Sequence, residues 1–147
     1  MGTSDIIENS QALTSVFGYW PSFHDANVVA AARGEDFQSV SIHVFTMTDR
    51  LDANGYFELV NHHVVELLFT GVEQNTLPKG YSSDCLDYLA FSSSDGQVSV
   101  SFQSHLDGDG DIVCKSVRVV SVTPCTSSGE IISPNSSLKR TDQSLRD

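Results

Sequence analysis

The sequence predicts an α+β fold, in which an N-terminal helix packs on a dominant, mostly antiparallel β-sheet of six to seven strands. One segment near the N-terminus repeats apolar residues at helical spacing, whereas most segments after residue 26 alternate apolar and polar residues. Turn residues separate these alternating segments. The chain has 147 residues, 39% of them hydrophobic, so it can bury one core, and no apolar run is long enough to span a membrane. We therefore expect a single domain without a membrane partner.

The helix is expected over residues 10–17. Ser10 can cap its first turn, and Gly18 can end its last turn. The apolar side chains of this segment are spaced by about one helical turn: Leu13, Val16 and Phe17. A helix this short needs a sheet against which to bury that apolar stripe.

Residues 18–26, the aromatic corner, join the helix to the first strand. Pro21 removes a backbone donor and keeps Trp20 extended, and we expect this only Trp of the chain to be buried. Two interpretations stay open: His24 and Asp25 bond backbone groups at a structural corner, or they are ligand or catalytic groups. The structural motif of the corner comprises Trp20, Pro21, Ser22, Phe23, His24 and Asp25.

Alternation and turn residues define the strands that follow. They are expected over residues 26–32, 40–46, 56–60, 62–70, 86–92, 97–103 and 112–122. The segment 62–70 is apolar on both faces, as in a central strand that is covered on both sides. The apolar phase of the last segment slips near Arg118, which predicts a bulge. Residues 1–124 are expected to form the domain, and residues 125–147, poor in apolar side chains, a mobile tail.

Candidate metal chemistry is weakly supported by the sequence. The run of Asp and Gly over residues 107–111 begins like a calcium loop, but the Gly and Glu that an EF-hand needs further on are missing. His24, Asp25 and His43 would suit zinc or iron if neighbouring strands brought them together. We predict no cofactor, no metal and no catalytic residue, and we keep a small metal-binding domain or enzyme built on these three residues as the alternative.

Cysteine usage and the N-terminus predict a cytoplasmic protein. The chain has three widely spaced cysteines and no C-x-x-C pair, so neither a disulfide framework nor a zinc site is expected. The first residues lack the basic and apolar regions of a signal peptide.

The net charge of −11 comes from 19 acidic and 8 basic residues, and charges cancel within residues 125–147. The excess negative charge therefore lies on residues 1–124, where it would repel nucleic acid and attract a basic protein, or serve solubility alone. The acidic residues of the loops beside the strands are candidate partner contacts: Glu35, Asp36, Asp49, Asp52, Asp84, Asp87, Asp107, Asp109 and Asp111.

Four stretches carry a resemblance to a known family: residues 16–26 (VFGYWPSFHDA), 42–48 (IHVFTMT), 54–57 (NGYF) and 69–73 (FTGVE). In order and spacing they are similar to the immunity protein 50 family, over about residues 10 to 123. Members are encoded beside bacterial polymorphic toxins, which they are thought to neutralise. The resemblance implies that this chain binds a cognate protein toxin, and an acidic surface would suit a basic toxin such as a nuclease.

Overall fold

The computed structural model describes residues 5–79, 81, 85–104 and 109–132. Within these residues it contains one α-helix and eight β-strands, and every strand pair is antiparallel. The elements are α1 (Gln11–Phe17), β1 (Asn27–Arg33), β2 (Phe37–Leu51), β3 (Phe57–Thr70), β4 (Gln74–Asn75), β5 (Leu86–Ser94), β6 (Gln97–Ser104), β7 (Gly110–Cys114) and β8 (Ser116–Pro124). The predicted α+β class with mostly antiparallel strands is confirmed.

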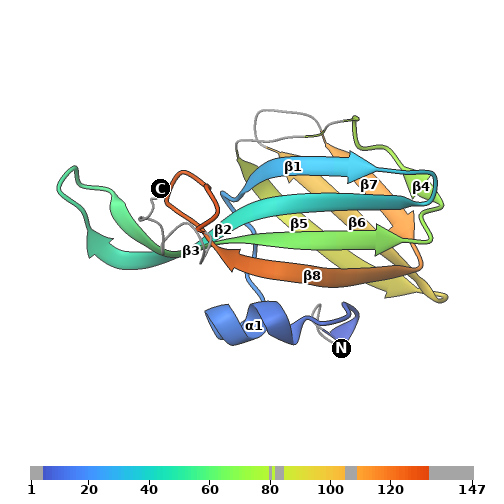
Figure 1. Cartoon of the computed structure of the whole chain (residues 1–147), viewed down its shortest axis with the longest axis horizontal. Coiled ribbons are helices and arrows are strands. Elements are labelled where there is room, and N and C mark those ends of the chain that lie inside the picture. Colours follow the sequence, from blue (N-terminus) through green and yellow to red (C-terminus); the bar gives the residue numbers. More distant parts are fainter. Residues whose placement is uncertain (1–4, 80, 82–84, 105–108, 133–147) are drawn as a thin grey trace, which may run out of the picture.

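The strands form two four-stranded sheets rather than one dominant sheet. The first sheet has the order β1-β2-β3-β8 and the second the order β4-β7-β6-β5. Figure 1 shows the two sheets stacked as layers, with their strands crossing obliquely. Each sheet has one strongly apolar face, and stacking removes both faces from water at once.

The core lies between the two sheets. The first sheet contributes alternate residues of β2 and β3, and β6 contributes the expected Val98, Val100 and Phe102. Phe69 and Phe102 meet across the layers, with ring centroids 6.0 Å apart. The side-chain amide of Asn75 also donates to Gln38 Oε1 at 2.9 Å and links the two sheets at one end.

The segment 112–122, predicted as one strand, contributes to two strands, β7 and β8, which belong to different sheets. The chain leaves the second sheet after Cys114 and enters the first sheet at Ser116. The chain thus changes sheet at Lys115. The irregularity predicted near Arg118 is also present, because the register of β8 shifts opposite Glu66 and Leu67, directly after Arg118. The segments 56–60 and 62–70, predicted as two strands, form one strand, β3. The strand continues through Asn61, which adopts a left-handed backbone with φ 58°.

Helix α1 lies along the β8 edge of the first sheet, as Figure 1 shows, and buries Leu13 and Phe17. Gly18 ends it in the left-handed conformation at φ 82°, as predicted. The predicted cap at Ser10 is wrong, because Ser10 has helical backbone angles and its side chain makes no capping hydrogen bond. Among the described helices none is long and apolar enough to cross a membrane.

Strands β2 and β3 extend well beyond their neighbours. Strand β1 pairs with β2 only as far as His43, and β8 pairs with β3 only from His63 onward. Residues 46–60, here called the arm, pair with each other and project from the sandwich at the left of Figure 1. The arm is thus a two-stranded hairpin without a third strand among the described residues.

The described part of the C-terminal segment turns back toward the first sheet. Cys125 forms a bridge with Ile131, and the Thr126 amide donates to the Glu130 carbonyl at 2.9 Å. Gly129 of this turn lies against the ring of His43. Residues 133–147 lie outside the described residues, so the mobile tail stays a prediction.

Candidate binding pocket at the aromatic corner

The backbone of the aromatic corner makes two left-handed turns in three residues. Phe23 has φ 64° and Asp25 has φ 66°, and His24 lies between them. A bulky residue such as Phe rarely adopts this region, which costs of order 1–3 kcal/mol. Since the Phe23 ring is buried in the core, the surrounding packing holds this conformation in place.

Hydrogen bonds fasten the corner to the start of β5. The Asp25 amide donates to the Leu86 carbonyl at 2.8 Å, and the Leu86 amide donates to the Ala26 carbonyl at 2.9 Å. Ser22 Oγ accepts a bond from the His24 amide at 3.2 Å. Both sheets therefore position the corner, which leads into β1 of the first sheet and is bonded to β5 of the second.

Trp20 packs at the rim of the sandwich rather than inside it. Its ring meets the rings of Phe23 and Phe91 edge-on, with centroids 5.8 and 5.9 Å away. The side chain is half-buried, so the expectation of a buried Trp is met only in part. The neighbouring Tyr19 is 55% exposed.

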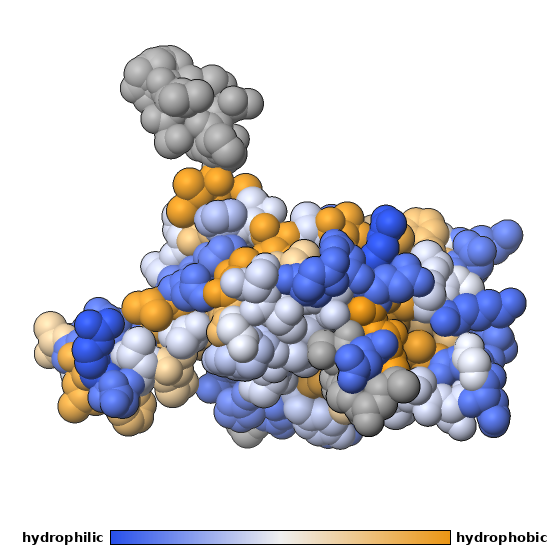
Figure 2. Space-filling view, turned by 90° about the horizontal axis from the view of Figure 1, so that it is seen from below, coloured by the Kyte–Doolittle hydropathy of each residue, from blue (hydrophilic) through white to orange (hydrophobic). Residues whose placement is uncertain are grey.

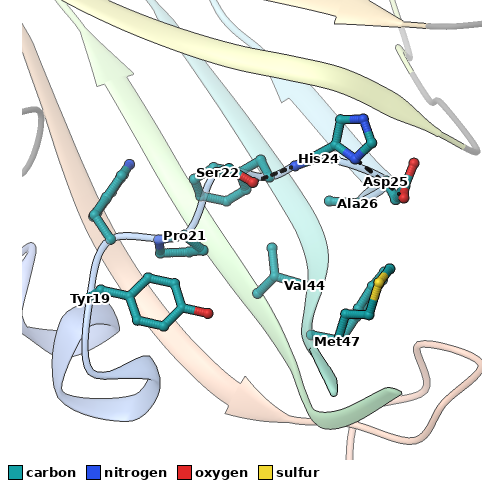
Figure 3. Close-up of a pocket in the computed structure, with 11 residues that line it drawn as sticks. Tyr19, Pro21, Ser22, His24, Asp25, Ala26, Val44 and Met47 are labelled. Atoms are coloured by element: carbon teal, nitrogen blue, oxygen red, sulfur yellow. Dashed lines mark hydrogen bonds and ion pairs between the residues drawn. The ribbon is translucent and has the colours of Figure 1, made fainter. Parts of the chain in front are cut away.

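A pocket of about 430 Å³ opens between the corner and β2. Its walls are residues 19–26 on one side and Val44, Phe45 and Met47 on the other. Figure 3 shows Tyr19 and Met47 on different sides of the opening, with Val44 between them and the hydroxyl of Tyr19 directed toward that space. The pocket exists because β1 starts only at Asn27, which leaves the end of β2 beyond His43 without a strand on that edge.

The wall of the pocket combines aromatic rings with one carboxylate. Asp25 Oδ2 lies 3.2 Å from His24 Nδ1, and Asp25 Oδ1 accepts a hydrogen bond from the Cys85 thiol at 3.4 Å. Burial raises the pKa of the Cys85 thiol, and its hydrogen bond to Asp25 raises that pKa further, so the thiol remains a donor. No Lys or Arg is among the described residues that line the pocket.

His43 does not join His24 and Asp25. Its ring is on the outer face of the first sheet, only 3% exposed, and its Nε2 lies 2.9 Å from His62 Nδ1. Burial lowers the pKa of His43, and the neighbouring His62 lowers it further. Across the described part of the chain, no three His, Cys, Asp or Glu residues come together as a metal site would require. The cluster considered from sequence is therefore not assembled.

A family model described as Immunity protein 50 matches residues 9–125. This chain belongs to the Immunity protein 50 family. The match begins just before α1 and ends directly after β8, so it includes both sheets, the aromatic corner and the arm. The resemblance of the four sequence stretches is thereby confirmed. No curated protein and no solved structure matches the chain.

In this Immunity protein 50 chain the predicted acidic contacts lie in several separate places. Glu35 and Asp36 lie in the turn before β2, whereas Asp49 and Asp52 lie in the arm at its other end. The remaining described ones lie at the starts of β5 and β7: Asp87, Asp109 and Asp111. Asp84 and Asp107 are outside the described residues, and so is Gly108 in the run 107–111. Which acidic residues contact a partner stays a prediction.

Sequence reasoning missed the side chains that complete the pocket and the exposed surface of the arm. Phe45 belongs to the strand predicted over residues 40–46 and Met47 directly follows it, yet both belong to one wall of the pocket. The arm also exposes Leu51, Tyr56 and Phe57. The sequence does contain a signal for this exposed surface. Large apolar residues are dense on both sides of the charged Asn-Gly turn, where a solvated loop would have few.

Proposed function

We propose that this protein is a cytoplasmic immunity protein that binds a cognate bacterial toxin and neutralises it. The observation that carries the proposal is the match of the Immunity protein 50 model to residues 9–125, which includes every described strand. The free thiols of Cys114 and Cys125 are compatible with a reducing compartment.

Neutralisation is proposed to occur by blocking, without catalysis by this chain. The alternative enzyme or metal-binding function required His24, Asp25 and His43 in one site. His43 is instead hydrogen-bonded to His62 on the outer face of the first sheet, whereas His24 is paired with Asp25. The features that remain around the corner and the arm are those of a binding surface: a pocket, exposed aromatic rings and a projecting hairpin.

The toxin is proposed to contact the arm and the adjoining pocket, which together are called the arm face. Tyr56 is 72% exposed and Leu51 is 63% exposed, and Met47 and Phe57 are also largely in water. Aromatic and Met side chains are the types that concentrate in the centres of protein interfaces. Figure 2 shows the arm standing apart from the body, with hydrophobic and hydrophilic residues interleaved on the visible face.

The charge of the arm face favours a basic partner. Asp49 and Asp52 lie in the arm, and Asp25 lies at the pocket. Arg50 pairs with Glu58 at 2.7 Å, so the positive charge of the arm is already compensated. A toxin with a positively charged face, such as a nuclease whose cleft attracts phosphate, would be complementary to this surface.

The proposal is tested by expressing the toxin that is encoded beside this gene, then measuring binding by calorimetry and protection of growing cells. Tyr56→Ser is expected to weaken binding at least tenfold, because an exposed Tyr that becomes buried in an interface is a typical energetic centre. Tyr88→Ser is the matched control, since Tyr88 is also exposed but lies on β5, away from the arm. Absence of binding and protection would contradict the function, whereas equal effects of the two variants would contradict only the arm face.

A further inference from the structure

We propose that the pocket at the aromatic corner binds the guanidinium group of an arginine side chain of the partner protein. That the partner is the toxin rests on the proposed function, whereas the affinity of the pocket for a guanidinium group does not. The inference is carried by three properties of the pocket: its aromatic walls, its carboxylate and its connection to the arm.

The aromatic walls offer flat surfaces to a planar cation. Four aromatic residues are among those that line the pocket, namely Tyr19, Trp20, Phe23 and Phe45, and Tyr19 is the most exposed of them at 55%. A cation near the face of such a ring is attracted by the ring quadrupole, most strongly where water is excluded. Guanidinium is planar and weakly hydrated, and it stacks on aromatic rings better than the compact ammonium of Lys.

The carboxylate of Asp25 supplies the negative charge for this cation. The side chain is 41% exposed, and its two described partners, His24 Nδ1 and the Cys85 thiol, contact different oxygens. An ionised carboxylate has about four lone-pair positions, so acceptor capacity remains for a forked donor. Of the described lining side chains, only His24 can carry a positive charge of its own.

Other occupants fit this chemistry less well. An anion would be repelled by Asp25, and a purely apolar side chain would take the carboxylate out of water without giving it a new partner. The volume of about 430 Å³ is in the range of small-ligand pockets, so part of the main chain beside the arginine can enter as well.

The pocket is also continuous with the surface that the arm exposes. Met47 lines the pocket, is 53% exposed and belongs to the arm. Figure 3 shows Met47 among the side chains around the pocket, so a partner that covers the arm would also reach this side of the pocket. An arginine placed there would combine a buried ion pair with the apolar contacts of the arm.

The affinity of the pocket is tested without the toxin, on the full chain. N-acetyl-L-arginine methylamide is titrated while amide and indole shifts are followed by NMR, and the uncharged citrulline analogue is the control. We expect shifts confined to residues 19–26 and 44–47, with a dissociation constant in the low millimolar range for arginine and at least tenfold weaker binding of citrulline. Equal binding of the two probes, or no localised shift, would overturn the proposal.

Two pairs of variants separate binding from folding. Asp25→Asn removes the charge, and Asn tolerates the left-handed backbone that Asp25 adopts. It should abolish the arginine shifts, whereas Asp36→Asn, at the far end of β2, should leave them intact. Tyr19→Leu should weaken arginine binding and Tyr19→Phe should not, because only the first removes an aromatic face. Retention of arginine binding by Asp25→Asn would overturn the proposal.

The same variants connect the pocket to the toxin. If Asp25→Asn weakens toxin binding at least tenfold and Asp36→Asn changes it less than twofold, the partner inserts its arginine here. If the unmodified protein binds the toxin and Asp25→Asn binds it equally well, the proposal for the pocket fails and the proposed function stands. If no toxin binds but the arginine probe does, the proposed function fails and the pocket stands.

Discussion

His43 is a titratable side chain that the fold buries on the outer face of the first sheet. It packs against Phe45 and Gly129, and it shares a hydrogen bond with His62, in which one ring nitrogen donates and the other accepts. Such a pair holds at most one extra proton without placing two positive charges side by side. A protonated His43 would also lose the hydration that its charge requires.

This burial makes stability depend on pH. In the unfolded chain His43 takes up a proton as the pH falls below about 6.5, whereas in the folded chain its pKa is lowered. Below about pH 6.5 the unfolded state therefore binds more protons than the folded state. The contribution of neutral, buried His43 to folding stability is complete above about pH 6.5, and it is lost as the pH falls toward the pKa of His43 in the folded chain. We expect the free energy of unfolding in urea to decrease on acidification by at most about 1.4 kcal/mol per pH unit from this residue.

The measurement compares the protein with His43→Gln at several pH values between about 5 and about 8, a range that spans the usual His pKa. All other titrating groups are shared, so the difference between the two slopes isolates His43 and its coupling to His62. The variant should show the shallower dependence, whatever its absolute stability. Identical slopes would contradict the account.

The arm is an element whose hydrogen bonds lack the support of a third strand. Inside the sandwich β2 lies between β1 and β3, but Met47 and Leu51 have only β3 partners. Side chains of the arm make hydrogen bonds within it. Thr48 Oγ1 donates to the Glu58 carbonyl at 2.9 Å, and Asp52 Oδ1 accepts from the Asn54 and Tyr56 amides. An isolated two-stranded hairpin is nevertheless marginally stable in water.

Hydrogen exchange should therefore divide β2 into two parts. We expect amides in the pairing arm, such as those of Met47 and Leu59, to exchange at least tenfold faster than those of Val40 and Ile42 in the sandwich, because arm opening exposes little apolar surface. The two segments belong to the same strand, so each serves as the control for the other. Equal protection would mean that the arm opens only with the whole domain.

At the scale of the whole molecule, the negative charges are spread over its length. Asp36 and Asp49 are thirteen positions apart along a nearly continuous strand, or roughly 40 Å at about 3.3 Å per residue. One partner interface of ordinary size, about 800 Å² on each side, cannot cover both ends. The turn with Glu35 and Asp36 and the arm with Asp49 and Asp52 must therefore contribute differently to association with the toxin.

Association with the toxin should slow about tenfold or more when ionic strength rises from about 0.05 to about 0.5 M, because screening shortens the reach of the charges. Neutralising the arm with Asp49→Asn and Asp52→Asn should remove much of this dependence, and Asn at position 52 keeps the acceptor that closes the turn. Glu35→Gln with Asp36→Asn, the same change in charge, should have little effect. The rates can be followed by stopped-flow fluorescence; a larger effect of the control pair would place the toxin at the opposite end.

Local patterns in the sequence were sufficient for the helix, for the approximate position of most strands and for the family. The end of α1 at Gly18 and the inward side chains of β6 follow from spacing alone, since a helix repeats about every 3.6 residues and a strand every two. The Trp20–Asp25 block, with the stretches around it, was sufficient for the resemblance to the Immunity protein 50 family.

Only the tertiary structure decided how these elements combine. Periodicity shows that a face is apolar but not what covers it. The change of sheet at Lys115 therefore could not be recognised from the sequence. For the same reason the arm resembled any other pair of strands. The approach of Met47 to the corner depends on where β1 stops pairing with β2, and that of His62 to His43 depends on the register of β2 against β3. Such contacts join residues far apart in the chain, and no local spacing encodes them; the pocket is a property of the packed sheets.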